Sequence, residues 1–275
     1  MNFLTAGTFR FRADISGQGP QWLVLLHELG GSLETWSDMT PALNTHFRVL
    51  AYDQRGSGQS QTVRGDFSID DHLRDLAGLL DAAGIAGAVH LAGVALGAGM
   101  AARFAARWPN KVASVVLANP ATAIPAARRD YLHQRAASVR AGGMQAVIDD
   151  TLDRSYPPEI RGDGIAYAAY RERFLRNDPQ SYAALNLALA GFDASQDLPR
   201  IACPALVLGG AHDRLRPPQE VERVAAQILG ARCALIDCGH IMPVQAPAEM
   251  SRAMLSFYDE IGVAGERDER GRTAP

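Results

Sequence analysis

Residues 89–99 read VHLAGVALGAG, an apolar, strand-like run that leads into closely spaced glycines. An alanine-rich stretch of helical composition follows directly, so the chain must pass from strand to helix in a tight turn that needs small flanking residues. Gly93 and Gly97 frame this turn in the spacing of the G-x-S-x-G motif, whose central serine is a nucleophile at the end of a strand. The central residue here is Ala95. The sequence therefore predicts a nucleophile elbow around a side chain that cannot attack a substrate.

The composition is that of a globular chain without a strong charge bias. With 275 residues, of which 47% are hydrophobic, the chain can bury one large core and a smaller appended unit. The formal net charge of -3 favours neither nucleic acid nor an anionic membrane as a partner. No signal peptide or membrane span is recognisable, and the three cysteines are expected to be reduced thiols. These features predict a cytoplasmic protein.

Outside the elbow, apolar runs alternate with segments of helical pattern. An opening strand or hairpin is expected over residues 3–14, and helices are expected near 35–43 and from Ser68 to Ala83. Strands separated by helices form βαβ units with parallel strands. The sequence thus predicts an α/β fold with a mostly parallel sheet flanked by helices. Its other strands are expected at 22–26, 48–52, 88–92, 112–117, 203–208 and 233–236.

The interval 121–199 interrupts this alternation. It has a helical pattern, contains no strand-like run and carries prolines at 157, 158 and 179. A helical insertion after a central strand is expected to lie over the carboxyl ends of the strands, where open α/β sheets bind ligands. We therefore predict a core of residues 1–120 and 200–262, a helical lid over 121–199, and a disordered tail over 263–275.

Two polar residues follow later strands, at the positions where partners of a nucleophile are expected. Asp213 comes after the apolar run at 203–208, and His240 follows the last predicted strand. The order nucleophile, acid, histidine is the one associated with this type of elbow. In such a triad the histidine takes the proton of the nucleophile, and the buried acid holds the histidine in the required tautomer. Taken alone, His240 could equally be a hydrogen-bonded loop histidine, but its position and its partner favour catalysis.

Five motifs occur in the order typical of one known family. They are His27 with Gly30-Gly31, the segment DQRGSGQS at 53–60, the elbow, Asp213, and Gly239-His240. Together they make the chain resemble the α/β-hydrolase family over about residues 3–262. The resemblance implies backbone N–H donors at Leu29 and Leu96 that hold an oxyanion, with His27 in the same oxyanion and substrate-binding region. It also implies a small-molecule substrate and no cofactor.

The predicted lid resembles that of 3-oxoadipate enol-lactonases. The similar segments are GGM at 142–144, NDPQSY at 177–182 and RPP at 216–218. This resemblance implies a substrate with a polarisable carbonyl group: a lactone, an ester, an amide, or a ketone whose C–C bond is hydrolysed. Because arginine binds carboxylates through two hydrogen bonds, the arginines of the lid favour a substrate that carries a carboxylate.

Glu28 is a second departure from the family pattern, which usually has glycine at this position. A carboxylate beside an oxyanion hole opposes the developing negative charge unless it is protonated or turned away. Two orientations are open: Glu28 points outward to pair with an arginine, or it points inward, where it orients a water or exchanges a proton with His240. Two departures at one centre favour natural divergence over a single engineered Ser-to-Ala change, and both explanations remain open.

The segment HELGG at 27–31 lacks the second histidine of a zinc-binding H-E-x-x-H motif, so no metal is predicted.

Three functional hypotheses follow. The first is a lactonase-like hydrolase, which is either an alanine variant or an enzyme that uses water activated by His240. The second is a lyase, decarboxylase or isomerase without a nucleophile, in which His240, Asp213 and Glu28 move a proton. The third is a ligand-binding protein that has kept the pocket. An intact pair of Asp213 and His240 favours chemistry over binding alone. The sequence does not specify the oligomeric state.

Overall fold

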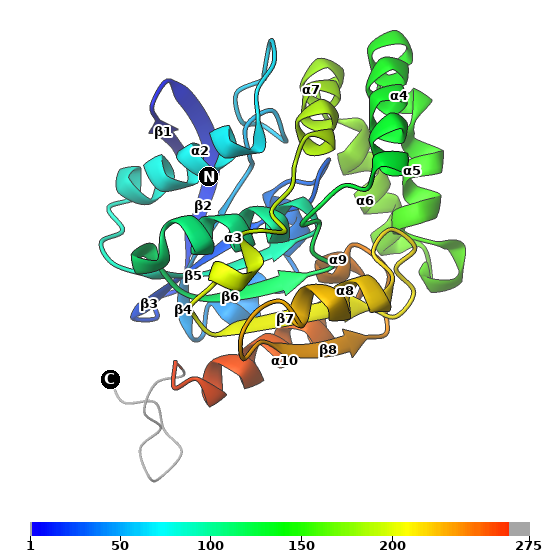
Figure 1. Ribbon diagram of the computed structural model, residues 1–275. Coiled ribbons are helices and arrows are strands. Elements are labelled where there is room, and N and C mark those ends of the chain that lie inside the picture. Colours follow the sequence, from blue (N-terminus) through cyan, green and yellow to red (C-terminus); the bar gives the residue numbers. More distant parts are fainter. Residues whose placement is uncertain (1, 264–275) are drawn as a thin grey trace.

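An eight-stranded sheet forms the centre of the computed structural model, which describes residues 2–263 (Figure 1). The strand order is β1-β2-β4-β3-β5-β6-β7-β8. The first two pairings, β1 with β2 and β2 with β4, are antiparallel, and the other pairings are parallel. The predicted α/β fold with a mostly parallel sheet is confirmed. The strands are β1 (Asn2–Ala6), β2 (Phe9–Ser16), β3 (Gln21–Leu26), β4 (Phe47–Tyr52), β5 (Val89–Val94), β6 (Val112–Ala118), β7 (Ala205–Gly210) and β8 (Arg232–Ile236).

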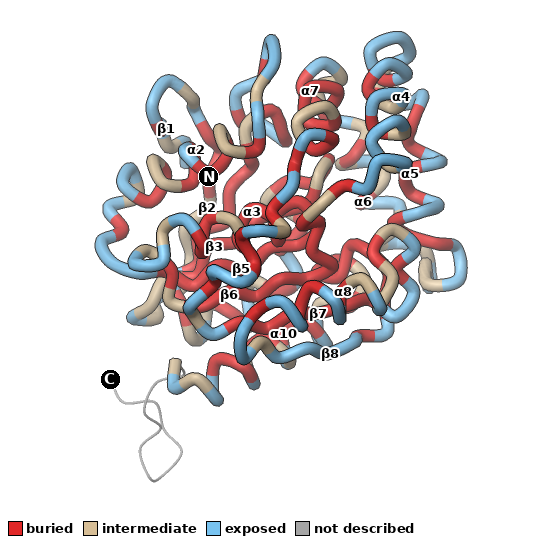
Figure 2. The backbone as a smooth tube through the Cα atoms, in the orientation of Figure 1, coloured by how far each residue is buried: buried red, intermediate tan, exposed pale blue. Residues whose placement is uncertain are grey.

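Helices cover both faces of the sheet and bury its central strands (Figure 2). Successive side chains of a strand point to opposite faces, so Val24 and Leu26 of β3 pack on one side and Leu23 and Leu25 on the other. The first face is covered by α2 (Ile69–Ala82), α3 (Leu96–Arg107) and α8 (Pro218–Ala225). The second is covered by α1 (Thr40–Leu43), α9 (Met242–Gln245) and α10 (Pro247–Glu260).

One predicted helix is split. Residues 35–43 were expected to form a single helix, but the structure has a short 3-10 helix η1 (Leu33–Trp36) followed by α1. Pro41 lies in the first turn of α1. Proline fits that turn because its missing N–H is not needed there, whereas inside a longer helix it removes a hydrogen bond and clashes with the preceding turn. The expectation of one continuous helix is therefore wrong.

The interval between β6 and β7 is helical, as its sequence pattern indicates. An isolated antiparallel bridge between Ala123 and Asp193 brings the two ends of this insertion together. The insertion has a hydrophobic cluster of its own, which also includes Ile241 and Val244 of the core. Figure 1 shows its helices grouped above the sheet, toward the arrowheads of β6 to β8. They are α4 (Ala126–Gly142), α5 (Ile148–Ser155), α6 (Ile165–Leu175) and α7 (Pro179–Ala190), joined by η3 (Met144–Ala146) and η4 (Pro158–Ile160).

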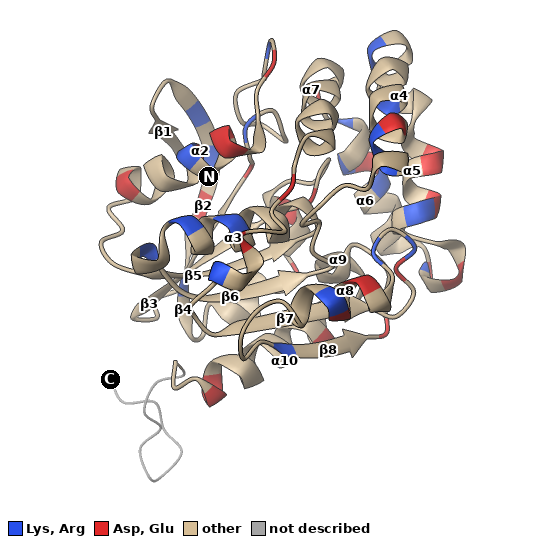
Figure 3. Ribbon diagram, viewed as in Figure 1, with Lys and Arg blue, Asp and Glu red and all other residues tan. Residues whose placement is uncertain are grey.

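Charged side chains are concentrated outside the sheet. Figure 3 shows Lys, Arg, Asp and Glu mainly on the helices and loops, while the strands β5, β6 and β7 are free of colour. No helix within residues 2–263 is long and apolar enough to cross a bilayer. Apart from Val263, the tail predicted to be disordered lies outside the described residues.

Candidate active site

Ala95 lies at the apex of the turn that joins β5 to α3. Its φ of 52° and ψ of -111° are unusual for a residue other than glycine and store backbone strain. Hydrogen bonds hold the turn, because Ala95 N–H donates to the Ala118 carbonyl and its own carbonyl accepts from Ala121 N–H. A Cβ at Gly97 would lie 2.1 Å from the Leu26 carbonyl oxygen, so this position needs glycine. The backbone turn of a nucleophile elbow is therefore present, with alanine at its apex.

Asp213 and His240 form a buried pair beside the elbow. His240 Nδ1 lies 2.7 Å from Asp213 Oδ2, and the residues are 8% and 4% exposed. The other oxygen of Asp213, Oδ1, accepts from the backbone N–H groups of Leu215 and Arg216. These bonds favour the tautomer in which Nδ1 donates to Asp213. His240 Nε2 makes no hydrogen bond to any residue in 2–263, so its lone pair is available in the cavity.

Asn119 positions the loop that carries His240, a role that sequence reasoning missed. It follows β6 directly, with a φ of 45°. Its Nδ2 donates to the carbonyls of Gly239 and His240 at 3.0 Å each, and its Oδ1 accepts from Gly210 N–H at 2.7 Å. Asn119 therefore links the end of β6 to the end of β7 and to the loop that follows β8. An asparagine after an apolar strand was the available clue, because asparagine tolerates positive φ better than most residues.

We expect Asn119→Ala to lower kcat with little change in KM. The variant removes the Asn119 hydrogen bonds of three backbone groups, which costs roughly 1–3 kcal/mol of unfolding free energy per group at most. Asn119→Gly is the matched variant, because glycine accepts a φ of 45° and isolates the loss of the side-chain hydrogen bonds from backbone strain. Steady-state kinetics and chemical denaturation measure both effects. A kcat equal to that of the unaltered chain in both variants would contradict this role.

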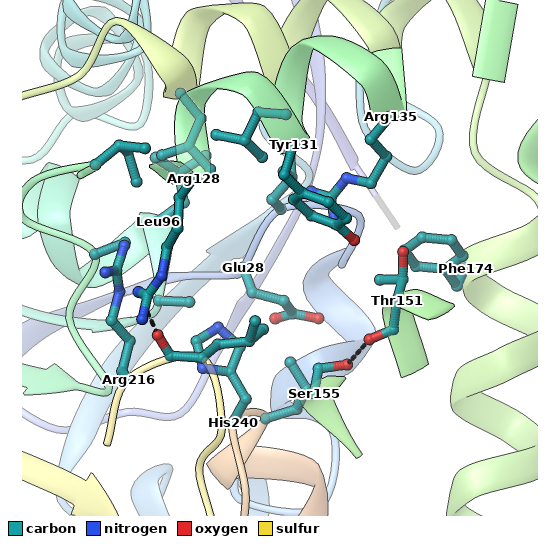
Figure 4. Close-up of a pocket in the computed structure, with 18 of the residues that line it drawn as sticks. Glu28, Leu96, Arg128, Tyr131, Arg135, Thr151, Ser155, Phe174, Arg216 and His240 are labelled. Carbon is teal, nitrogen blue, oxygen red and sulfur yellow. Dashed lines mark hydrogen bonds between the residues drawn. The ribbon is translucent and has the colours of Figure 1, made fainter. Parts of the chain in front are cut away.

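A cavity of about 110 Å³ lies between the elbow and the helical insertion (Figure 4). Five of the residues singled out in the sequence line its wall: Glu28, Leu29, Ala95, Leu96 and His240. Asp213 stands behind His240 and does not line the wall. The rest of the wall is contributed largely by apolar and aromatic side chains of the insertion, such as Tyr131, Phe174 and Leu189.

Leu29 and Leu96 line this cavity, and their backbone N–H groups have no acceptor among the described residues. Neither Leu29 N–H nor Leu96 N–H donates a hydrogen bond within the described part of the chain. Leu96 is the first residue of α3, where a helix carries unpaired N–H groups and partial positive charge. Paired donors of this kind can hold an oxyanion, and they do not depend on the side chain at position 95.

His27 is not among the residues that line the cavity, so the geometry does not support its expected place in substrate binding, which stays a prediction. Its ring is 1% exposed, and both ring nitrogens are bonded to backbone groups. Nδ1 lies 2.7 Å from the Glu28 carbonyl oxygen, and Nε2 accepts from Gln54 N–H. The sequence showed a polar residue at the loop but not the direction of its ring. Through these two hydrogen bonds, His27 stabilises the loop that carries Leu29.

Glu28 points into the protein, so the hypothesis that it turns outward to an arginine is wrong. The residue is 2% exposed and lines the cavity. Its Oε1 accepts hydrogen bonds from Tyr170 OH at 2.8 Å and Thr35 Oγ1 at 3.1 Å. Burial, followed by the charge of Glu28, raises the pKa of Tyr170 well above its usual range, so the phenol stays a donor. Its Oε2 has no partner among the described residues.

Three arginines line the cavity: Arg128, Arg135 and Arg216. Arg128 and Arg216 share one carboxylate, Glu220, at 3.2 and 3.4 Å. Burial, and then the neighbouring charge of Arg128, lowers the pKa of Arg216, although a guanidinium stays charged at neutral pH. Arg135 Nε donates to Asn186, and no carboxylate within residues 2–263 lies at ion-pair distance from it. Arg128 and Arg216 therefore place two positive charges against the one carboxylate of Glu220.

The Cys238 thiol does not supply a nucleophile in place of the serine. Burial raises the pKa of the Cys238 thiol to about 12, so it remains protonated. Across residues 2–263, no group of three or more His, Cys, Asp or Glu side chains is arranged to hold a metal ion.

Comparisons with known proteins identify the family of the fold. Residues 21–141 match the model of a family described as alpha/beta hydrolase fold. The chain is 32% identical to RutD of Stutzerimonas stutzeri, to which carbamate hydrolase activity is ascribed, over 86% of this chain and 91% of that protein. It is 27% identical to 3-oxoadipate enol-lactonase 2 of Acinetobacter baylyi, over 84% and 86%. The crystal structure of the enol-lactonase from Burkholderia xenovorans superposes with a TM-score of 0.90 at 29% identity, covering 94% of this chain and 100% of that one.

Proposed function

Since the chain belongs to the alpha/beta hydrolase fold family and its relatives are hydrolases, we propose that it hydrolyses a small carbonyl compound with a water molecule in place of the missing serine. The observation that carries this proposal is the pair of His240 and Asp213. The base is buried and oriented, its Nε2 is free, and it faces a cavity in which residue 95 offers no competing hydroxyl.

The proposed reaction uses these groups in one cycle. Water donates a proton to His240 Nε2 as its oxygen adds to the substrate carbonyl carbon, and Asp213 stabilises the imidazolium that forms. The N–H groups of Leu29 and Leu96 hold the tetrahedral oxyanion, a contribution of about 2.7–4 kcal/mol per donor in comparable sites. The imidazolium then returns the proton to the leaving oxygen, and His240 is neutral again.

The substrate we propose is a lactone or ester that carries a carboxylate. Arg128 and Arg216 share a single counter-charge, so a substrate carboxylate between them would add the missing negative charge and relieve their repulsion. Relatives named as enol-lactonases and a carbamate hydrolase support ring esters and carbamates as starting points for assays.

Matched substrate pairs test this proposal. The unaltered chain is assayed with lactones, esters and carbamates that are made with and without a carboxylate, and hydrolysis of the carboxylated members is expected. Failure to hydrolyse any member of the panel would contradict the function, whereas equal rates within each pair would contradict only the carboxylate site.

We expect Arg128→Gln to raise KM for the carboxylated substrate about tenfold or more, because a charge-assisted hydrogen bond contributes about 1.5–3 kcal/mol. KM for the uncharged partner substrate should stay within a factor of two or so of the unaltered chain. Arg252→Gln is the matched control, since Arg252 is exposed on α10 and pairs with Glu249. The same increase for both members of a pair would show a general distortion of the cavity.

A second candidate function is supported by the unpartnered oxygen of Glu28. In a lyase, decarboxylase or isomerase, Glu28 or His240 would take a proton from carbon, and the N–H groups of Leu29 and Leu96 would hold an enolate. Such an enzyme would exchange substrate C–H for deuterium in D₂O without adding water to the product. Product analysis by NMR separates this reaction from hydrolysis.

A further inference from the structure

The carboxylate of Glu28 has one oxygen that accepts hydrogen bonds and one that is buried without a donor. Oε1 receives two hydrogen bonds, one from Thr35 in η1 and one from Tyr170 in α6. Oε2 is buried and accepts from no side chain or backbone group in residues 2–263. A buried carboxylate oxygen without a donor is costly, so this geometry calls for a donor supplied by a bound molecule.

The position of this carboxylate is built from both the core and the insertion. Thr35 belongs to η1 of the core, and Tyr170 reaches Glu28 from the insertion, where it is 3% exposed. A Cβ at Gly31 would lie 2.3 Å from Oε1, so glycine makes room for the side chain. Figure 4 shows the carboxylate of Glu28 and the ring of His240 turned into the same space.

We propose that Glu28 holds the attacking water together with His240, an inference that rests on the proposed hydrolysis. A water molecule needs 2–4 polar partners in a site of this kind. One hydrogen of the water is accepted by His240 Nε2 and the other by Glu28 Oε2, which leaves a lone pair of the water oxygen directed at the substrate carbonyl. Glu28 therefore takes the place of the covalent link that fixes a serine hydroxyl on the elbow.

Every proton in this step is accounted for without a further reactant. The water proton on the His240 side moves to Nε2, and the remaining hydroxyl forms the new bond to the carbonyl carbon. Glu28 stays a carboxylate throughout and keeps its hydrogen bond to that hydroxyl. The imidazolium gives its proton to the leaving oxygen. The negative charge of Glu28 opposes the oxyanion, so its orientation of the water must outweigh this repulsion.

When a serine is present, the repulsion between Glu28 and the oxyanion is expected to outweigh the benefit of a held water. In Ala95→Ser the nucleophile is covalently fixed, so acylation needs no held water, while the repulsion between Glu28 and the oxyanion remains. Removal of the Glu28 charge should therefore slow the alanine enzyme and accelerate acylation in the serine enzyme. A purely structural role for Glu28 would lower both rates together.

The test is a four-protein comparison on one substrate that the unaltered chain hydrolyses: the unaltered chain, Glu28→Gln, Ala95→Ser, and the double variant. In the alanine background we expect Glu28→Gln to lower kcat roughly tenfold to a hundredfold, with a smaller change in KM. In the serine background we expect it to raise the acylation rate. Loss by the same factor in both backgrounds, or no loss in the alanine background, would overturn the proposal.

Two further variants keep the test interpretable. Tyr170→Phe removes a hydrogen bond to Oε1 and leaves the charge in place, so it should lower kcat in the alanine background alone. Glu222→Gln removes an exposed acid of α8 and should change neither background. If Ala95→Ser hydrolyses a panel on which the unaltered chain is inactive, the proposed function fails and this inference fails with it. An active unaltered chain that is insensitive to Glu28→Gln overturns this inference alone.

Discussion

Replacement of His240 by alanine is expected to lower kcat/KM by about 10²–10⁴-fold, the range typical of general acid–base catalysis. No other imidazole in residues 2–263 lines the cavity, and its Nε2 is the group we assign to proton transfer. Because the proton reaches the leaving oxygen through the same ring, the variant should slow both the addition of water and the departure of the leaving group. Steady-state kinetics on a carboxylated lactone or ester measure the loss.

The matched control is His212→Ala. His212 also lies near the carboxyl ends of the strands, but it is exposed and hydrogen-bonded to Asp237 at 2.7 Å, outside the cavity wall. This variant should keep the activity of the unaltered chain. If His240→Ala is folded, as judged by its thermal unfolding, and retains full activity, then proton transfer through His240 is excluded.

Restoration of the serine, Ala95→Ser, is expected to raise the rate of hydrolysis about 100-fold or more and to introduce an acyl-enzyme. The elbow already holds residue 95 at a φ of 52°, and the oriented base and the free N–H groups of Leu29 and Leu96 are in place. Only the hydroxyl is missing from the covalent mechanism. A burst of product equal to the enzyme concentration, and an acylated mass in quenched samples, would record the intermediate.

The effect of the serine should be largest when Glu28 is also replaced by glycine, the residue usual in the family. The unaltered chain is the control, and it should show neither a burst nor an acylated mass. If the serine variant gains no hydrolysis and the alanine protein converts a candidate substrate without adding water to it, the hydrolase proposal is lost and the second candidate function is favoured.

The structural setting of Glu28 bears on the origin of the alanine. A single engineered Ser-to-Ala change would not by itself place a buried carboxylate at residue 28, with Gly31 making room for it and Tyr170 donating to it. The structure shows that the two departures from the family pattern, Ala95 and Glu28, line the same cavity, and the natural origin of the alanine stays a prediction.

The backbone of the site could be predicted from the sequence because it depends on local rules. Glycines four residues apart between an apolar run and a helical pattern specify the elbow, and Asp213 and His240 each follow a strand, so parallel strands bring them to one edge of the sheet. The register and strand order then place the two side chains within hydrogen-bond distance.

Other features depend on contacts between distant segments and could not be predicted. The inward direction of Glu28 is stabilised by a hydrogen bond from Tyr170, 142 residues further along the chain, and the sequence pattern carries no sign of that contact. Asn119 acts through the backbone of Gly210, Gly239 and His240, which lie together only in the folded sheet. The orientation of the His27 ring toward Gln54 also depends on a contact between distant segments, so the sequence pattern could not predict it.

The addition of water to the substrate is the central claim, and it can be measured by turnover in H₂¹⁸O. The unaltered chain is incubated with a carboxylated lactone or ester, and the new carboxyl group of the product is examined by mass spectrometry. Hydrolysis by a water held at His240 predicts one ¹⁸O atom in that group for each turnover. A product without the label, or no turnover of any carbonyl substrate, would contradict the account.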